Sequence, residues 1–460
     1  KKLMTSEKTS SQFDFSRWRG GSWVYRWVGL FSPWREGSYL LQWAEPIGVL
    51  LVGLVLSLAP FVSSSLVGVL LIAGAGYWML LTFSDRDLLG ITPVHLLVLL
   101  YWAIATVTVA FSPVKAEAFS GWIKLTLYLF WFALSARVLR SPSLRNWTIA
   151  LYLLVSLVIS VYGIRQEIFG VEQLATWNDP DSELAEATRA YSYLGNPNLL
   201  AGYLLSAISL SISALWVWRT RLQKGVALTA LLVNTYCLYA TDSRGGWIAL
   251  VGLLTVYLLL FYYWYRESLP PFWRVWLLPF VFTFFAGLLL AAITFVEPLR
   301  LRVMSIFAGR EDSSNNFRMT VWAAVFEMIR DRPWLGIGPG HSAFNAIYPL
   351  YQRPNYTALS AYSIYLEHIV EMGVIGFTIF LGLLVTISYH GWQKITSLRN
   401  LNNQEGFWII GAISAIIGML THGLVDTVWY RPEIQTLWWL MVALVASYYP
   451  QIDSKQSNII

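Results

Sequence analysis

The sequence predicts an all-α, polytopic membrane protein, and its composition carries that prediction. Of 460 residues, 56% are hydrophobic and only 13% are charged, whereas about 25% of a soluble domain is charged. The chain therefore lacks the charge to cover a water-exposed globule, and its apolar content also excludes disorder. Aromatic residues reach 16%, and Trp and Tyr gather where membrane helices meet water.

The apolar stretches predict the number of membrane spans. A bilayer core about 30 Å thick requires about 20 apolar residues in each helix that crosses it. About twelve stretches approach this length, so we expect about twelve spans, in one block over residues 44–296 and a second over residues 366–449. They are residues 44–62, 65–83, 92–111, 119–139, 147–164, 199–218, 225–241, 247–264, 276–296, 371–389, 407–424 and 435–449.

Lys and Arg residues in the short loops predict which side the termini face. With an even number of spans, residues 1–43 and 450–460 lie on the same side. The loops on that side contain Arg86, Arg140, Arg145, Arg219, Arg221, Lys224, Arg266, Arg274, Lys394 and Arg399. The opposite loops contain Lys115, Arg244 and Arg431. Since cytoplasmic loops are rich in Lys and Arg, both termini are predicted to be cytoplasmic, in a plasma (inner) or thylakoid membrane.

The N-terminal segment 1–43 alternates arginines with aromatic residues. It contains no short apolar run followed by a small-residue cleavage site, so it is not a signal peptide. Such a segment either lies on anionic lipid head groups or docks a partner. Membrane lipids are thus the expected partners, and we find no nucleic-acid-binding motif to explain the net charge of +6. The tail 450–460 is short and polar and is predicted to be disordered.

Two loops on the outer side are too long to be simple connectors. Residues 165–198 hold six acidic residues. Residues 297–365 form the larger loop, within which apolar residues of 317–330 recur at helical spacing. We expect an amphipathic external helix there, packed over the membrane bundle. The glycines of 336–340 predict a tight turn that returns the chain to the membrane.

The sequence around Arg244 is a candidate anion site. Arg244 follows Ser243 in a very short outer loop, and Gly245 comes next, just before an apolar helix. A guanidinium, unshielded backbone N–H groups and a helix N-terminus all favour negative charge. The alternative is a structural arginine that pairs with Asp242 or with backbone carbonyls. Arg318 and Trp322 are four residues apart on one face of the external helix. If that face packs on the bundle, Arg318 joins Arg244 over one cavity; the alternative is a surface arginine on a solvated helix.

Other ionisable residues lie near the outer ends of predicted spans. Lys124 either joins the anion site, since intramembrane charges tend to be functional, or extends to the head groups. Glu367 is either a general base or a helix-dipole partner, and His341 is either functional or a solvent-exposed loop residue. Three residues, His422, Asp426 and Arg431, are either a structural group or support the site. Asn196 and Asn198 flank a proline at a predicted helix start and can also line an outer pocket.

Several motifs, taken in order, resemble the O-antigen ligase and polymerase superfamily of bacterial membrane proteins. They are residues 193–201, residues 243–247, Arg318 with Trp322, residues 331–340, and the pair 365–367 and 371–376. A match over nearly the whole chain resembles the cyanobacterial IctB family, which is named for inorganic carbon transport. Residues 309–318, 359–363, 426–428 and 430–433 carry that second resemblance.

The resemblance implies an outward-facing cavity that holds a glycan linked to a polyprenyl diphosphate. Arg244 and Arg318 map to the two arginines that hold the diphosphate, and no metal or other cofactor is implied. The ligase histidine corresponds to Tyr362, which is a poor base at neutral pH. Tyr362, Glu367 or His341 then has to orient the acceptor, with Tyr362 and Glu367 as the catalytic candidates.

Three functions therefore remain open. The first is binding, and transfer, of a lipid-linked glycan by a metal-independent glycosyltransferase. The second is bicarbonate transport through the same anion site, as the IctB resemblance implies. The third is a non-catalytic lipid-binding membrane protein. The sequence does not predict the oligomeric state.

Overall fold

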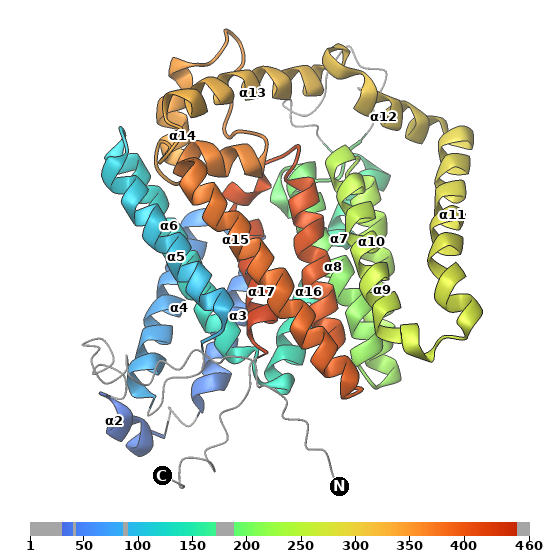
Figure 1. The fold of residues 1–460 in the computed structure, drawn as a ribbon, viewed down its shortest axis with the longest axis horizontal. Helices are drawn as coiled ribbons and strands as arrows, with labels where there is room; N and C mark the ends of the chain where they lie inside the picture. The colour runs from blue at the N-terminus through green and yellow to red at the C-terminus, as the bar shows by residue number, and fades with distance from the viewer. Residues whose placement is uncertain (1–29, 40–42, 86–90, 172–187, 449–460) are drawn as a thin grey trace, which may run out of the picture.

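The computed structural model describes residues 30–39, 43–85, 91–171 and 188–448. Over these ranges the chain forms α-helices, short 3-10 helices and no strand (Figure 1). The predicted spans correspond to α3 (Ala44–Leu58), α4 (Ser64–Ser84), α5 (Pro93–Phe111), α6 (Lys115–Val138), α7 (Pro142–Phe169), α8 (Pro197–Val217), α9 (Arg221–Ala240), α10 (Arg244–Tyr265), α11 (Pro271–Phe295), α15 (Ile364–Asn400), α16 (Gly406–His422) and α17 (Pro432–Ala446).

Length and hydropathy support an integral membrane protein. Among the described residues, eight helices are long and apolar enough to cross a membrane, namely α4 to α8, α10, α11 and α15. Helices α3, α16 and α17 are apolar but shorter. The total of twelve spans and the cytoplasmic side of the termini stay predictions.

The centre of the bundle is formed by α8, α16 and α17. Helix α8 is 83% buried over its most apolar window, against 0% for α11. Small residues allow α8 and α16 to approach closely: Ser209 Oγ donates to the Gly411 carbonyl at 2.7 Å. Close packing of small residues, helped by hydroxyl hydrogen bonds, is how helices associate in lipid. Helix α11, by contrast, stands at the edge of the molecule (Figure 1).

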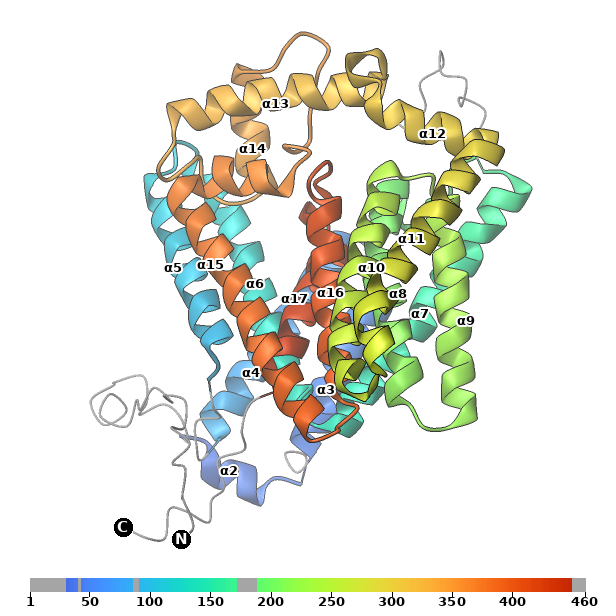
Figure 2. The same ribbon diagram turned by 45° about the vertical axis from the view of Figure 1, so that its right-hand side comes forward.

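Three helices lie together at one end of the bundle: α12 (Glu297–Phe307), α13 (Ser313–Asp331) and α14 (His341–Ile347). Helix α2 (Ser32–Gly37) lies at the opposite end (Figure 2). The amphipathic helix predicted over 317–330 falls within α13, whose buried residues Val321, Ala324, Val325 and Met328 follow helical spacing. Helix α12 was not predicted, because its apolar residues alternate with arginines.

The glycine turn at 336–340 returns the chain to the bundle and also binds backbone groups at a break in α15. Helix α15 is broken at Gly373, where φ is 64° and ψ is −175°, a conformation open almost only to glycine. The break releases backbone groups that the preceding turn satisfies. Ile337 N donates to the Val370 carbonyl and Gly338 N to the Glu371 carbonyl, each at 2.9 Å. The turn therefore caps a broken helix, and α15 begins seven residues before the predicted span.

At the α2 end, ion pairs hold the start of the described chain to the bundle. Asp85 binds Arg137 of α6 at 2.6 Å and also pairs with Arg35 of α2. Arg137 further binds Glu45 at 2.9 Å. Most of the arginine- and aromatic-rich segment 1–43 lies outside the described residues, as do the tail 450–460 and five of the six acids predicted in the 165–198 loop. The sixth, Glu167, belongs to α7 rather than to a loop.

Candidate functional site

A cavity of about 270 Å³ lies where the α13 end of the bundle meets α12 and α13. We call helices α12 and α13 the cap. The cap, the starts of α8 and α10, the segment after α16 and Arg189, which precedes α8, all contribute to the cavity. Its lining includes four arginines, Arg189, Arg244, Arg302 and Arg318, together with Asn198, Ser243, Gly245, Ser314, Asn315, Trp322 and Asp426. We call it the arginine cavity.

Local sequence explains why α10 begins at the cavity. Ser243 is its N-cap, and the side chain accepts a hydrogen bond from Gly246 N at 3.2 Å. A Cβ atom at Gly246 would lie 2.7 Å from the Ala201 Cβ of α8, and one at Gly245 would lie 3.0 Å from the His422 ring of α16. The two glycines therefore allow the start of α10 to pack against both central helices, which places Arg244 over the bundle.

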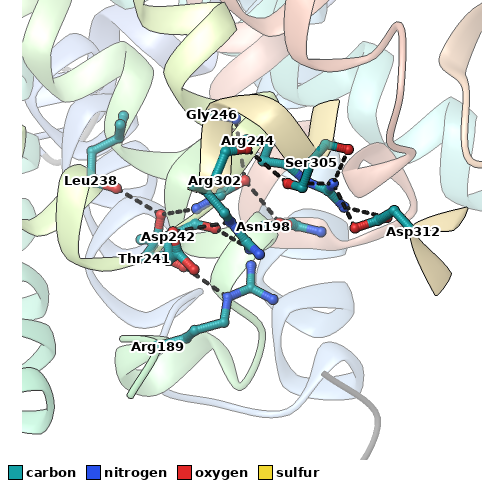
Figure 3. Close-up of polar contacts among 11 residues, drawn as sticks. Arg189, Asn198, Leu238, Thr241, Asp242, Arg244, Gly246, Arg302, Ser305 and Asp312 are labelled. Atoms are coloured by element: carbon teal, nitrogen blue, oxygen red, sulfur yellow. Dashed lines mark hydrogen bonds and ion pairs between the residues drawn. The ribbon is translucent and has the colours of Figure 1, made fainter. Parts of the chain in front are cut away.

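Arg244 is held by the cap. Its Nη1 and Nη2 atoms donate to the two carboxylate oxygens of Asp312, each at 3.0 Å, and Nη1 also reaches the Ser305 carbonyl and hydroxyl at 3.0 Å (Figure 3). The sequence offered Asp242 or backbone carbonyls as partners of a structural Arg244. The Ser305 carbonyl is such a partner, whereas the carboxylate that binds Arg244 belongs to Asp312 and not to Asp242. Asp312 is itself the N-cap of α13 and accepts from Asn315 N at 2.8 Å, so the pair ties α10 to α13.

Two further arginines, missed by the sequence reasoning, join the cavity (Figure 3). Arg302 of α12 donates to the Asp242 carbonyl at 2.6 Å and pairs with its carboxylate at 3.1 Å. Arg189 donates to the Thr241 carbonyl at 3.1 Å. Burial and the neighbouring Arg302 lower the pKa of Arg189 to about 10, and burial lowers the pKa of Arg302. These lowered pKa values reflect cations crowded together away from water.

A chain of hydrogen bonds connects the other side of the cavity. Ser243 Oγ donates to Asn198 Oδ1 at 2.8 Å, and Asn198 Nδ2 donates to Asp426 Oδ2 at 2.6 Å. Arg318 Nη2 lies 3.6 Å from the same Asp426 oxygen, while Nη1 donates to Ser314 at 2.6 Å. Asn198 and Asp426 thus connect α8 to α13 through the cavity wall. Asn196 instead caps α8, as predicted for a helix start.

The lining of the arginine cavity is cationic and rich in donors. Four arginines and one aspartate give the lining side chains a formal charge of +3 (four minus one). Asp312 and Asp242, which bind Arg244 and Arg302 from outside the lining, reduce the charge of the whole group to +1 (four minus three). The Arg318 Nε and Trp322 Nε1 donors are buried and have no hydrogen-bond partner among the described residues. Guanidinium groups match the oxygens of carboxylates and phosphates. The arrangement can therefore hold an anion with several oxygen atoms.

The other predicted residues do not all reach this cavity. Lys124, His341 and Glu367 line a second, smaller cavity of about 130 Å³. His341 is half-buried at the start of α14, not exposed in a loop. Tyr362 lines neither described cavity: its ring packs edge-on against Phe317, and burial raises its pKa above the usual value.

The three residues predicted to act together at the end of α16, His422, Asp426 and Arg431, do not form one hydrogen-bonded cluster among the described residues. No hydrogen bond joins His422 to Asp426 in the described chain, and both ring nitrogens of His422 lack a described partner. Asp426 binds Asn198 instead. Arg431 pairs with Glu433 at 3.2 Å and lines neither described cavity. Of the three residues, Asp426 alone contributes to the lining of the arginine cavity.

A family model described as O-antigen ligase matches residues 229–381, which include Arg244, Arg302, Arg318 and the glycine turn. No curated protein matches the chain. The matched segment runs from α9 into α15 and so covers the cap helices and three of the four cavity arginines. Residues 229–381, about a third of the chain, are therefore similar to the O-antigen ligases, and the helical, membrane-type fold is consistent with that similarity.

Proposed function

We propose that the protein binds the diphosphate of a polyprenyl-linked glycan in the arginine cavity and transfers the glycan to an acceptor. The observation that carries the proposal is the gathering of four arginines around one cavity with a single lining carboxylate. A diphosphate offers several anionic oxygens, so more than one guanidinium can bind it at once. A monoanion can satisfy fewer of them.

The arginines also suit the chemistry of glycan transfer. When the glycosidic bond to the diphosphate breaks, negative charge develops on the leaving oxygen. Fixed cationic donors in a partly dry cavity stabilise such charge strongly. Arg318 and Trp322 hold donors that are free to bind it, with no described partner. Arg244 has to exchange its bonds to Asp312 for bonds to the substrate.

The side from which substrate enters follows from the loop charges. The arginine cavity lies at the α13 end of the bundle, and the cytoplasmic side is predicted from Lys and Arg residues in the loops at the other end. The cavity then faces the outer side of the membrane, where a lipid-linked glycan would present its diphosphate at the head-group level. Tyr362 lines neither described cavity, and the proposal gives it no role in transfer.

Binding of inorganic pyrophosphate to the full-length protein in lipid nanodiscs, measured by calorimetry, tests the proposal. Arg318→Gln is expected to weaken binding about 10- to 100-fold, because a hydrogen bond to a charged group contributes about 1.5–3 kcal/mol. Arg330→Gln is the matched control, since Arg330 is exposed on the same helix. Mass spectrometry of lipids extracted with the protein is expected to detect a polyprenyl diphosphate.

Bicarbonate is the competing ligand, and the same preparation distinguishes it. Labelled bicarbonate is added to the solution outside liposomes that contain the protein, and its uptake is followed with time. If uptake is saturable and Arg318→Gln abolishes it, and if pyrophosphate does not bind, the proposed glycan transfer is wrong and the protein transports anions. Pyrophosphate binding without uptake supports the glycan.

A further inference from the structure

The second cavity lies next to the arginine cavity but is built from different elements. It is bounded by α5, α6, the glycine turn, α14, α15, α17 and the segment 427–430. Asp426 lines the arginine cavity and the adjacent Thr427 lines the second, so one short segment separates the two. A Cβ atom at Gly121 of α6 would overlap the Pro339 carbonyl. That glycine therefore allows the turn to approach α6 and close one wall of the cavity.

Two buried oxygen atoms beside this second cavity have no hydrogen-bond partner among the described residues. Glu367 is only 7% exposed. Thr427 and the Ala361 backbone lie beside its carboxyl group, yet Glu367 Oε2 receives no hydrogen bond from the described residues. Gln435 Oε1 is also buried and receives no hydrogen bond within the described ranges. An unsatisfied buried oxygen costs about 1–3 kcal/mol, and such groups in native proteins generally have a partner.

The chemistry of the lining limits what that partner is. The unpartnered acceptors need a ligand that donates hydrogen bonds. The lining offers one cationic side chain, Lys124, beside the carboxyl groups of Glu367 and Glu371, so it has fewer cations for a free phosphate or carboxylate than the arginine cavity has. A bound metal ion is also disfavoured, because no group of three His, Cys, Asp or Glu residues suited to a metal occurs among the described residues.

Aromatic residues supply the remaining walls. Tyr101, Tyr128, Trp429 and Tyr430 line the cavity, and the Trp429 Nε1 donor has no described partner. His341 stacks on Tyr430 with ring centroids 5.2 Å apart. Unpartnered acceptors and flat aromatic side chains in one lining suit a ring that carries hydroxyl groups on its rim and C–H groups on its faces. A single sugar unit has these properties, and a cavity of about 130 Å³ limits it to a small group.

We propose that the second cavity binds a neutral, hydroxyl-bearing sugar unit, with one hydroxyl donating to Glu367 Oε2 and another to Gln435 Oε1. Binding of such a ring stands on the second cavity alone. Its identity as the acceptor of the glycan rests on the proposed function, since only then does the arginine cavity across the 425–430 segment hold the donor.

Saturation-transfer NMR on the full-length protein in nanodiscs tests this inference. The probes are methyl glycosides of glucose, galactose, mannose and N-acetylglucosamine, with glycerol as a polyol that has no ring. At least one glycoside is expected to show saturable binding. Glu367→Gln and Gln435→Leu are each expected to weaken it about tenfold, whereas glycerol shows no saturation. Glu327→Gln, on the exposed face of α13, is the control and leaves binding unchanged.

Pyrophosphate binding, measured on the same samples, separates the two proposals. Glu367→Gln and Gln435→Leu are expected to leave pyrophosphate affinity within about twofold of the wild type. If no glycoside binds saturably, or if one binds equally well to both variants, the sugar site is wrong, whatever pyrophosphate does. If a glycoside binds as expected but pyrophosphate does not bind, the sugar site stands and the proposed function fails.

Discussion

Arg244 and Asp312 form two hydrogen bonds of 3.0 Å each, so the first cavity arginine is neutralised by a carboxylate of the cap. Arg244 begins α10 and Asp312 caps α13. The pair therefore does two things: it holds the cap on the bundle, and it occupies donors that an anionic ligand needs. Its strength sets how readily the cavity accepts a diphosphate.

Asp312→Asn is expected to raise the affinity for pyrophosphate about three- to tenfold. Asparagine caps a helix as well as aspartate does, so α13 keeps its N-cap, while Arg244 loses an anionic competitor. Calorimetry on the nanodisc preparation measures the change. Glu311→Gln removes an exposed charge from the adjacent residue and serves as the control. Weaker binding in Asp312→Asn would mean that Asp312 orients Arg244 for the ligand instead of competing with it.

Arg302→Gln is expected to make the stability of the protein depend more strongly on pH. Burial raises the pKa of Asp242 above its ordinary 3.8 even with three arginines nearby. The folded protein thus holds this proton more tightly than the unfolded chain. At pH values above the pKa of Asp242 in both states, its buried carboxylate lowers the free energy of unfolding. This destabilisation disappears as pH falls through the raised pKa of the folded state toward the pKa of the unfolded chain.

Loss of Arg302 removes the main cation beside Asp242 and enlarges that destabilisation to about 1–3 kcal/mol at neutral pH. Thermal unfolding from pH 7.5 to 4.5 is expected to show a gap in Tm between wild type and variant that is widest at pH 7.5 and narrows in acid. Adding Asp242→Asn to the Arg302→Gln variant is expected to remove the pH dependence of this gap in Tm. A gap that is constant with pH would exclude the charge of Asp242 as its cause.

Gly373→Ala is expected to destabilise the protein by about 3 kcal/mol or more. The backbone conformation of Gly373 is strained for any other residue, and an added Cβ atom would overlap the Trp334 carbonyl group. Gly76→Ala is the matched control, because a Cβ atom at Gly76 of α4 meets no other atom within 4 Å. Thermal unfolding measures both. Equal stability of the two variants would show that α15 can straighten without cost.

Asp85→Asn is expected to lower stability without affecting ligand binding. Asp85 lies between Arg137, whose side chain is 5% exposed, and Arg35 of α2. Breaking a buried ion pair costs about 3–5 kcal/mol, since the remaining charge loses its partner. Both cavities lie at the other end of the bundle, so pyrophosphate affinity is expected to stay within twofold. A large change in affinity would reveal coupling between the two ends.

The sequence predicted the helices well but not the way they meet. Apolar runs located α8 and α13 because the hydrophobic pattern of a helix is local in sequence. The sequence did not single out Arg302 because α12 carries two arginines, Arg300 and Arg302, and nothing local indicates which one faces the bundle. Asp312 was likewise overlooked as the partner of Arg244, since 68 residues separate the two. The division of the candidates Lys124 and Arg318 between two cavities has no local signal.

The sequence by itself determined that this chain is a helical membrane protein with a candidate anion site at Arg244 and Arg318. Composition and periodicity suffice for that, because the bilayer imposes length and hydropathy on each helix separately. The tertiary structure decided which charges meet. Close packing at Gly121, Gly245 and Gly373 brings α6, α10 and α15 against distant segments. Pairing of charges depends on distances across the fold, and only those contacts fix which arginines share one cavity and which carboxyl group lines the next.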